Sequence, residues 1–446
     1  MASSMGVTLL PLFLVFLATI TAHSLNNNHP TCYTDEEEHD STLKVFHISS
    51  QCSPFRPKTQ LSWAETVLKM QTDDQTRFTY LSSSLLLVAP GGGGKSFVPI
   101  GSGRQIVQSP TYIVKAKIGT PAQTLLLALD TSTDMAMVPC SGCVGCASSA
   151  PPFAFAKSTT FTSLKCGASQ CKQVQNSCLG TACLMNMTYG ASSIAANLAQ
   201  DNITLATDTV TGFSFGCIQK AVGTSLPPQG VLGLGRGSLS LLSQSKSLYK
   251  STFSYCLPSY KSPKFSGTLR LGPIGQPKNI KYTPLLTNPR RPSLYYVKLV
   301  GIKVGPKLVS IPPSAFALNP NNGAGTIIDS GTVFTRLVTP AYTAVRDEFR
   351  RRVGRNAVVS SLGGFDTCYK VAIAKQVPTM TFIFEGAELS MKQENFLIYS
   401  STGGITCLAM SASPSLNVIA NMQQQNHRIL FDLPNSRIGI SAESCS

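Results

Sequence analysis

Histidine is scarce in this chain of 446 residues, and its scarcity excludes several kinds of active site. Four of the five histidines, His23, His29, His39 and His47, lie near the N-terminus, so the rest of the chain holds only His427. A site that pairs a serine or cysteine nucleophile with a histidine base would have to use that residue. It stands in "QQQNHRILFD", where polar residues lead into an apolar strand, and we expect it at the surface or at a strand edge. Acid–base chemistry must therefore fall mainly to carboxylates.

Charged residues and long apolar segments are also sparse. Charged residues make up 13% of the chain and hydrophobic residues 43%. The hydrophobic fraction is enough to form large buried cores, and together with the low charge it argues against disorder. The apolar segments are short and are separated by Ser, Thr, Gly and Pro, a pattern typical of strands and turns. The composition predicts an all-β protein that is long enough for two or three domains.

The one long apolar run lies at the N-terminus. Residues 1–24 read "MASSMGVTLLPLFLVFLATITAHS", with a proline inside the apolar stretch, small residues after it and no basic cluster beside it. This pattern predicts a cleaved signal peptide and no membrane anchor. We therefore expect a secreted, extracellular protein, with the vacuole as an alternative, whose cysteines meet an oxidising compartment.

Residues 25–105 differ in character from the chain that follows. They hold an acidic run at 35–40, a helical pattern over 63–83 and a glycine run at 91–94 that is typical of a flexible linker. We interpret this segment as a pro-segment that covers a basic body until it is cut, at a point between the glycine run and about Ser109. An ordinary helical N-terminal extension is the alternative.

The net charge is strongly positive after this segment. Residues 1–105 hold 7 Lys or Arg and 8 Asp or Glu, leaving 30 and 13 in the remainder, so the body carries about +17. Such a body attracts polyanions, and acidic cell-wall polysaccharide is a candidate partner. The cluster "FRRRVGR" at 349–355 reads as the solvated face of one helix. Since no nucleic-acid-binding motif accompanies the charge, we do not expect nucleic acid as a partner.

Two aspartates stand in matching surroundings. Asp130 in "LDTSTD" and Asp329 in "IIDSGT" each follow a buried-strand pattern and precede small hydroxyl residues, which can donate to a buried carboxylate. Residues so far apart in the chain meet only in a fold with two similar halves. Facing loops would bring the carboxylates within hydrogen-bond range, where they would share one proton and could activate a water to attack an amide.

These two signatures resemble the paired Asp-Thr/Ser-Gly-Ser/Thr motifs of pepsin-like aspartic proteases. Three further segments are similar to segments of that family and occur in the same order. "MTYGASS" (187–193) resembles the flap hairpin, and "QGVLGLGRGSLSLLSQ" (229–244) and "NVIANMQQQNHRILFDLPNSRIGIS" (417–441) resemble the hydrophobic-hydrophobic-glycine segments of the two lobes. The resemblance implies an all-β, bilobal pepsin-like fold, with an N-terminal lobe over 106–275, a C-terminal lobe over 276–446 and the active-site cleft between them.

The resemblance also implies an activity and its residues. The chain would be an aspartic endopeptidase made as a zymogen, with Asp130 and Asp329 as the catalytic dyad and Tyr189 as the flap residue that closes over a peptide or protein substrate. Hydroxyl side chains beside the aspartates would orient the carboxylates and tie the two loops together: Thr131, Thr133, Ser330 and Thr332. We expect a monomer that uses no cofactor and no metal.

Three residues depart from the family pattern. Ser132 stands where the family usually has glycine, which places a side chain beside Asp130. Met137 stands where a tryptophan commonly holds the flap tyrosine, so Tyr189 should be more mobile. Ala420 replaces the usual glycine of the second hydrophobic-hydrophobic-glycine segment. None of these changes removes a carboxylate, but together they predict turnover that differs from that of an ordinary acid-optimum protease.

Cysteine, in contrast, is abundant. Of 14 cysteines, Cys32 and Cys52 lie in the 25–105 segment and 12 follow it. Tight Cys-x-x-Cys spacing suits zinc, but an even number in a secreted chain almost devoid of histidine favours disulfides. The pattern resembles that of the plant nepenthesin-like branch, with its cysteine-rich insertion between the first aspartate and the flap. That resemblance implies the pairs Cys140–Cys143, Cys146–Cys217, Cys166–Cys183, Cys171–Cys178, Cys256–Cys445 and Cys368–Cys407.

Two sequons, at Asn186 and Asn202, predict glycosylation, and Asn202 is the safer acceptor because Asn186 lies close to Tyr189. Within the nepenthesin-like branch the chain looks most similar to the atypical apoplastic and chloroplast-nucleoid aspartyl proteases, some of which act in plant defence. The leader lacks the Arg-rich character of a transit peptide, so we expect the apoplast and keep the chloroplast as an alternative. A catalytically weak binding or inhibitor protein of the cell wall, or a basic polyanion-binding protein, is the competing function.

Overall fold

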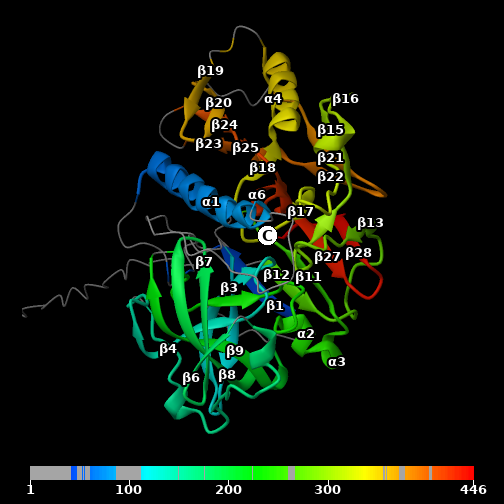
Figure 1. Ribbon diagram of the computed structural model, residues 1–446. Helices are drawn as coiled ribbons and strands as arrows, with labels where there is room; N and C mark the ends of the chain where they lie inside the picture. The colour runs from blue at the N-terminus through cyan, green and yellow to red at the C-terminus, as the bar shows by residue number, and fades with distance from the viewer. Residues whose placement is uncertain are drawn as a thin grey trace, which may run out of the picture.

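The computed structural model shows two β-rich halves with one long helix lying between them (Figure 1). It describes residues 42–47, 53, 55, 61–86, 112–148, 150–174, 176–223, 225–259, 267–354, 357, 359–370, 377–400 and 404–445. The predicted all-β, two-lobed fold is confirmed. The signal peptide, the acidic run and the glycine run lie outside the described residues. Within those residues, no helix is long and apolar enough to cross a membrane.

The N-terminal half is a mainly antiparallel assembly around β3, with parallel pairs between β3 and β10 and between β4 and β9. The β3 sequence "QTLLLALD" is a nearly continuous apolar run, and six of its eight residues are buried, as expected for a strand covered on both faces. It pairs with β2 on one side and with the short β10 on the other. The strands are β2 (Tyr112–Ile118), β3 (Gln123–Asp130), β4 (Met137–Val144), β5 (Thr162–Ser163), β6 (Asn176–Leu179), β7 (Ala182–Tyr189), β8 (Ser192–Leu205), β9 (Asp208–Val222) and β10 (Val231–Gly233).

The C-terminal half repeats this arrangement on a smaller scale around β17, which pairs in parallel with β26. The two further sheets in this half each have four strands, β16-β15-β21-β22 and β19-β20-β24-β23. The strands are β14 (Tyr296–Val297), β15 (Leu299–Val304), β16 (Lys307–Leu308), β17 (Thr326–Ile328), β18 (Thr335–Val338), β19 (Val359–Leu362), β20 (Phe365–Tyr369), β21 (Met380–Phe384), β22 (Ala387–Met391), β23 (Leu397–Tyr399), β24 (Thr406–Leu408), β25 (Met410–Ser413) and β26 (Asn417–Ile419).

A shared layer of strands joins the two halves. Strand β11 of the first half pairs with β27 of the second, and β1, from the N-terminal segment, inserts between β12 and β2. Through β1, residues 25–105 therefore contribute a strand to the sheet that both lobes share. The remaining strands of this layer are β1 (Thr42–His47), β11 (Thr252–Cys256), β12 (Gly267–Leu271), β13 (Lys281–Leu286), β27 (His427–Asp432) and β28 (Arg437–Ala442).

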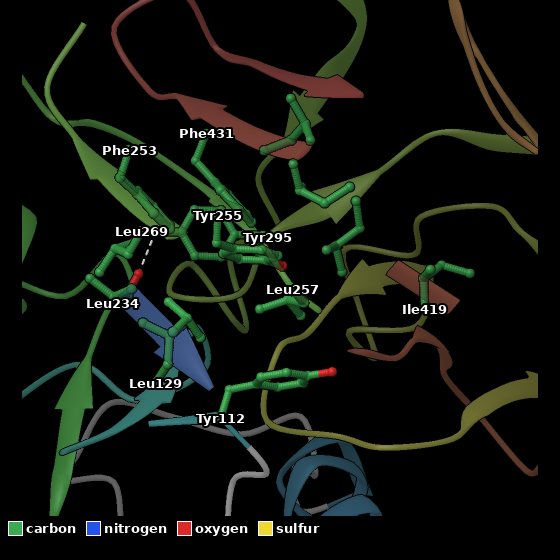
Figure 2. Close-up of a cluster of buried hydrophobic side chains, with 14 of the residues drawn as sticks. Tyr112, Leu129, Leu234, Phe253, Tyr255, Leu257, Leu269, Tyr295, Ile419 and Phe431 are labelled. Carbon is green, nitrogen blue, oxygen red and sulfur yellow. Dashed lines mark hydrogen bonds between the residues drawn. The ribbon is translucent and has the colours of Figure 1, made fainter. Parts of the chain in front are cut away.

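Aromatic side chains fill the junction between the halves (Figure 2). Phe253 on β11 and Phe431 on β27 stack with ring centroids 4.3 Å apart, and Tyr295 meets Phe431 edge-on at 4.5 Å. The Tyr295 hydroxyl donates to the Leu234 carbonyl oxygen at 2.5 Å, which satisfies its polar end. This cluster fixes the two lobes against each other beneath the aspartate loops.

The helices are few, and the predicted helix over 63–83 is confirmed as α1 (Trp63–Leu86). Ser62 and Glu65 form a capping box at its start: the Glu65 carboxylate accepts from the Ser62 backbone N–H at 2.8 Å, and Ser62 Oγ accepts from the Glu65 backbone N–H at 3.2 Å. The other helices are α2 (Leu241–Gln244), α3 (Lys246–Tyr249), α4 (Thr339–Val353), α5 (Gln393–Phe396) and α6 (Asn421–Gln424), with short 3-10 turns at Phe155–Lys157, Cys171–Gln173 and Pro313–Ala315.

Six disulfides join the twelve cysteines of the body, and their pairing corrects four of the six predicted bonds. The bonds Cys256–Cys445 and Cys368–Cys407 are confirmed. In place of the predicted Cys140–Cys143, Cys146–Cys217, Cys166–Cys183 and Cys171–Cys178, the structure has Cys140–Cys217, Cys143–Cys146, Cys166–Cys178 and Cys171–Cys183.

Burial explains the corrected pairing. Cys140 and Cys217 are both buried on the neighbouring strands β4 and β9, and Cys171 and Cys183 are both fully buried in the insertion. The cysteines closer to the surface pair with one another, because a disulfide requires side chains that reach the same layer of the protein. Chain spacing carries no information about this layering.

Candidate active site

The two aspartates lie at the ends of equivalent strands. Asp130 is the last residue of β3 and lies beside Gly233 of β10. Asp329 directly follows β17, and its backbone N–H donates to the carbonyl oxygen of Ile419 on β26 at 3.1 Å. A side chain at Gly233 would meet the backbone of Met135 at 2.5 Å, so glycine is required there. Both carboxylates are buried. The predicted meeting of two similar halves is confirmed.

Hydroxyl groups tie the two aspartate loops together, as expected. Ser330 Oγ accepts from the Thr131 backbone N–H at 3.2 Å, and Thr131 Oγ1 accepts from the Ser330 backbone N–H at 3.0 Å. Ser330 Oγ also donates to the carbonyl oxygen of Leu129 at 3.1 Å. Because each loop supplies a donor and an acceptor to the other, the relative position of the carboxylates is set by two short side chains and three backbone groups.

Asp130 is held by four donors of the body. Its Oδ1 accepts from the backbone N–H and the hydroxyl of Ser132, at 2.8 and 3.0 Å, and its Oδ2 accepts from Thr133 Oγ1 at 3.0 Å and from the Tyr189 hydroxyl at 2.9 Å. The supporting position of Thr133 was predicted. The hydroxyl of Ser132, the residue that departs from the family pattern, adds a donor that a glycine could not supply.

Asp329 has three donors of the body. Thr332 Oγ1 donates to Oδ2 at 2.5 Å, and Oδ1 accepts from the Gly331 backbone N–H at 3.2 Å and from Thr131 Oγ1 at 3.3 Å. The predicted support from Thr332 is confirmed. Since glycine stands at 331, no side chain corresponds to that of Ser132, and the two carboxylates are therefore not equivalent.

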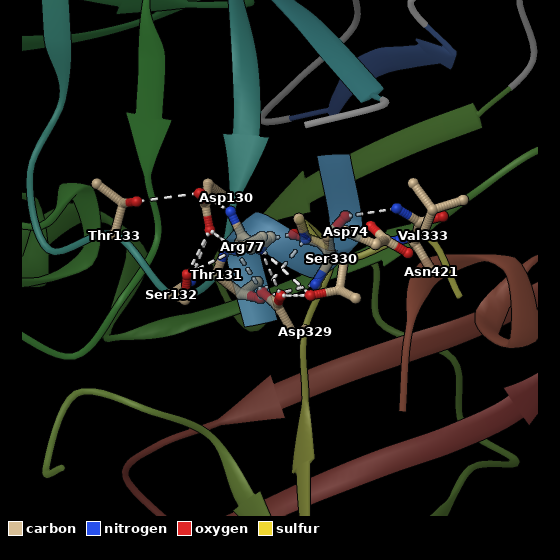
Figure 3. Close-up of polar contacts among 12 residues, drawn as sticks. Asp74, Arg77, Asp130, Thr131, Ser132, Thr133, Asp329, Ser330, Val333 and Asn421 are labelled. Carbon is tan, nitrogen blue, oxygen red and sulfur yellow. Dashed lines mark hydrogen bonds and ion pairs between the residues drawn. The ribbon is translucent and has the colours of Figure 1, made fainter. Parts of the chain in front are cut away.

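An arginine from α1 stands between the two carboxylates (Figure 3). The Arg77 guanidinium donates to both oxygens of Asp130, at 2.8 and 2.9 Å, and to both oxygens of Asp329, at 2.9 Å each. It also donates to Ser132 Oγ at 2.6 Å. Its side chain is only 5% exposed. Two bidentate ion pairs in a buried site make a rigid contact, in which one positive charge lies between two carboxylates.

The contact with Arg77 changes the pKa of the groups that form it. Burial alone would raise the pKa of Asp130, but Arg77, the Ser132 backbone N–H and the Tyr189 hydroxyl outweigh it and lower that pKa to about 2. Burial opposes the charged form of Arg77 as well, and its two aspartates hold its pKa well above the ordinary value. In this state Arg77 forms ion pairs with both aspartates.

The rest of α1 packs over the aspartate loops. Val67 joins a cluster with Val333 and Phe334, and Phe78 and Leu81 join a second one with Ile327. Gln71 donates to the carbonyl oxygen of Leu362 at 3.2 Å and accepts from the Gly364 backbone N–H at 2.8 Å. The buried face follows a helical repeat of three and four residues, at 67, 71, 74, 78 and 81.

Asp74 makes the second polar contact of α1 with the body. Its two carboxylate oxygens accept from the backbone N–H groups of Val333 and Phe334, at 2.7 and 2.5 Å. Burial raises the pKa of Asp74 to about 7, although Arg336 and the two N–H groups act in the opposite direction. Burial likewise raises the pKa of the neighbouring Asp73 to about 7.

Tyr189 lies at the end of β7, where the β7–β8 hairpin turns back, which is the position predicted for a flap residue. The ring is 4% exposed and belongs to the same apolar cluster as Met137. Because no tryptophan is present at 137, the hydroxyl finds its partner in Asp130 directly. Burial and the Asp130 charge raise the pKa of Tyr189 well above its ordinary value. The residue expected to be mobile is thus fixed by a buried hydrogen bond in this state.

Sequence reasoning missed Arg77 and Asp74 as residues of the site. The signal was present, because both interrupt the apolar face of the predicted helix, and buried charges are rare unless paired. The expectation for His427 was wrong: it is 4% exposed, its ring nitrogens lie 3.0 Å from Gln425 O and 3.1 Å from Ser390 O, and burial lowers its pKa. It lies on β27 and takes no part in the aspartate site.

The other sequence features are placed as follows. Ala420 is fully buried and donates its backbone N–H to Thr335 Oγ1 at 3.0 Å. Asn186 is exposed on β7, and Asn202 is half-buried with its amide 3.3 Å from Thr120 Oγ1; glycosylation at both stays a prediction. Within the described residues, no group of three or more His, Cys, Asp or Glu could hold a metal ion.

Comparison with known proteins agrees with the geometry. Family models described as xylanase inhibitor N-terminal and xylanase inhibitor C-terminal match residues 112–273 and 294–442. The chain is 47% identical to aspartyl protease AED3 of Arabidopsis thaliana, over 93% of this chain and 94% of that protein, and 42% identical to aspartyl protease 25 of Oryza sativa subsp. japonica, over 91% and 94%. It is 34% identical to nepenthesin-1, an aspartic proteinase of Nepenthes gracilis, over 75% and 78%.

Solved structures show the same fold at lower identity. The structure of edgp has a TM-score of 0.61 at 23% identity and covers 75% of this chain and 92% of its own, and basic 7S globulin from soybean has a TM-score of 0.60 at 21% identity and covers 75% and 93%. At this level of identity the likeness concerns the fold alone.

Proposed function

Because this chain belongs to the pepsin-like aspartyl protease family of plants, we propose that it is an aspartic endopeptidase that is secreted to the apoplast as a latent precursor. The observation that carries the proposal is the complete set of hydroxyl donors on both carboxylates, in two loops joined by Thr131 and Ser330. A site without catalytic use would have no need to bury two facing carboxylates at this cost. The substrates are peptides or proteins, and the chain works as a monomer.

The reaction requires the dyad without its arginine. When Arg77 has left, the two buried, facing carboxylates hold one proton between them, because ionising both in a buried site costs too much free energy. The ionised carboxylate takes a proton from a water, and its protonated partner donates to the substrate carbonyl oxygen as the water attacks the carbon. Tyr189 leaves Asp130 and closes over the peptide. No covalent intermediate forms on the protein.

The same geometry supports latency of the uncut chain. Arg77 fills the place of the water and pairs its single positive charge with both carboxylates, and α1 covers the loops that a substrate must reach. Activity then requires that α1 leave, after a cut between 87 and 111 or after a change in pH. Residues 25–105 would then act as a pro-segment, as the sequence predicts. Their composition predicts an acidic segment on a basic body, whereas at the two aspartates the segment contributes a basic residue to acidic partners.

A binding protein on the same scaffold is the second candidate. The matching family models are named for xylanase inhibitors, and basic 7S globulin shares the fold, so the fold alone does not require catalysis. A body of about +17 would also retain acidic polysaccharide, with strong dependence on salt.

Peptide cleavage tests the proposal. The full chain, with a protease site placed in residues 91–94, is folded, cut there, and assayed on a peptide library from pH 3 to 7 with and without pepstatin. We expect cleavage that Asp130→Asn reduces by at least about a thousandfold and that Asp347→Asn, a change at a side chain 58% exposed on α4, leaves intact. A folded, cut protein that cleaves no peptide at any pH would favour the binding protein.

A further inference from the structure

A carboxylate binds beside the dyad in this structure, and it comes from α1. The two oxygens of Asp74 each accept from a separate backbone N–H, those of Val333 and Phe334, and the side chain is nearly completely buried. These two residues directly follow the Asp-Ser-Gly-Thr loop of the second aspartate, so their N–H groups belong to the body and not to α1. Both oxygens of Asp74 act as acceptors, a role that a carboxyl group can fill and that the nitrogen of a side-chain amide cannot.

A positive charge accompanies the two N–H groups. Arg336 on β18 is 7% exposed, and the described partners of its side chain all belong to α1: it donates to Gln75 Oε1 at 2.8 Å, lies 5.1 Å from the ring centre of Phe78, and attracts Asp74. Its Nε is buried and makes no hydrogen bond among the described residues. When α1 leaves, this guanidinium and the two N–H groups therefore lose these partners together.

We propose that the Val333 and Phe334 N–H groups and Arg336 form, in the protein freed of α1, a subsite that binds an acidic side chain of the substrate. Donors left without partners in a partly dry site are costly, and a carboxylate satisfies all of them at once. Asp74 shows the ligand that fits. The positive charge of the body adds attraction for acidic peptides at long range. This inference rests on the proposed proteolytic function for its consequence, a preference for Asp or Glu near the bond that is cut.

The distance along the helix sets the position of that residue. Asp74 precedes Arg77 by three residues, which is about 4.5 Å along a helix axis, and the Arg77 guanidinium stands on the dyad. An extended peptide advances about 3.3 Å per residue. The acidic side chain should therefore lie one or two residues from the scissile bond, on one side of it only.

Matched peptides test this subsite. The chain, folded in full and then cut in residues 91–94, is given peptides in which Glu or Gln is placed in turn at each of the three positions on either side of one scissile bond. At one or two adjacent positions we expect kcat/KM to be about tenfold or more higher for Glu than for Gln. Arg336→Gln should bring this ratio close to one, and Lys298→Gln, a control at a side chain 53% exposed, should preserve it.

A binding measurement separates this inference from the proposed function. Labelled Glu and Gln peptides are titrated by fluorescence anisotropy into the cut Asp130→Asn protein, which is not expected to cleave them. Tighter binding of the Glu peptide, lost in the Asp130→Asn, Arg336→Gln double variant, supports the subsite even if the parent protein cleaves nothing. Cleavage of all peptides with a Glu to Gln ratio near one at every position would overturn the subsite while the protease stands. Equal binding of both peptides would overturn it as well.

Discussion

At the scale of single residues, Ser132 makes the two facing carboxylates unequal. Its hydroxyl donates to Asp130 at 3.0 Å, and Gly331, at the corresponding place beside Asp329, offers only a backbone N–H. A side chain at 331 would also come within 2.2 Å of the Arg77 guanidinium. The departure from the family pattern is thus confined to the half in which there is room for it, and it favours the charged form of Asp130.

Removing that hydroxyl should move the acid limb of the pH profile. Ser132→Ala leaves the backbone N–H but takes one donor from the Asp130 carboxylate, so the pKa of Asp130 in the active protein rises and less of the base is ionised in acid. We expect kcat/KM at the acid end of a pH 2 to 7 series to fall by up to about tenfold, with little change near pH 6. Ser132→Thr, which retains a hydroxyl, should restore the limb. An unmoved limb in Ser132→Ala would show that the serine fills space only.

At the scale of elements, the ion pairs of Arg77 should hold α1 on the aspartate loops. Arg77→Gln removes the charge that pairs with both aspartates while it leaves the apolar contacts of Val67, Phe78 and Leu81 in place. Breaking a buried ion pair costs about 3–5 kcal/mol, so α1 should release readily and the uncut chain should cleave peptide. Lys69→Gln, at a side chain 44% exposed, is the matched control and should stay silent. The measurement is the rate of peptide cleavage by uncut chains, and equal silence of both variants would mean that packing alone keeps the site closed.

Docking of α1 should also depend on pH, in two opposite ways. The docked helix lowers the pKa of Asp130 to about 2, so the stability that the Arg77 pair contributes is present above the ordinary value near 3.8 and is lost as the pH falls towards 2. Burial on docking raises the pKa of Asp73 and Asp74 to about 7, so their contribution is fully present below the ordinary value near 3.8 and is lost as the pH rises from there to about 7. Docking should therefore be strongest near pH 4 and should weaken towards both pH 2 and pH 7.

The only tryptophan of the chain reports this directly. Trp63 begins α1 and packs against the cluster that contains Phe334 and Phe365. Its emission should shift to the red as the pH falls from 4 towards 2, and again as the pH rises from 4 towards 7, because the ring becomes exposed. The acid transition should be absent from Arg77→Gln, because that variant lacks the pair that titrates. An emission maximum that is constant from pH 2 to 8 in the parent chain would contradict this account.

At the scale of the whole molecule, the sequence was sufficient for whatever depends on a local pattern or on a motif. The apolar run before Asp130, the hydroxyls after it and the flap tyrosine each have one structural meaning in a two-lobed fold, and the structure brings them together as predicted. The capping box and the repeat of buried residues in α1 are likewise local. These features required no knowledge of what the element would contact.

Contacts between distant segments could not be predicted in this way. The pairing of Cys140 with Cys217 depends on which strand lies beside β4, and the burial of His427 depends on the layer that joins the lobes. Arg77 could be recognised as an odd residue on an apolar helix face, but its partners lie 53 and 252 residues away in the chain. For Arg77, Cys140 and His427, the chain near the residue does not contain its partner, so the fold decides the contact.

The layer that joins the lobes should make the molecule unfold as one unit. Phe431 on β27 stacks on Phe253 of the first half and meets Tyr295 of the second, and it is fully buried. Phe431→Ala should lower the free energy of unfolding by about 3–5 kcal/mol, and because the cavity opens between the lobes, both should melt together at a lower temperature. Val359→Ala, at a residue 40% exposed on β19, should cost less than about 0.5 kcal/mol. Calorimetry of the two variants checks this: if Phe431→Ala splits the transition into two, each lobe has a core that holds without the shared layer.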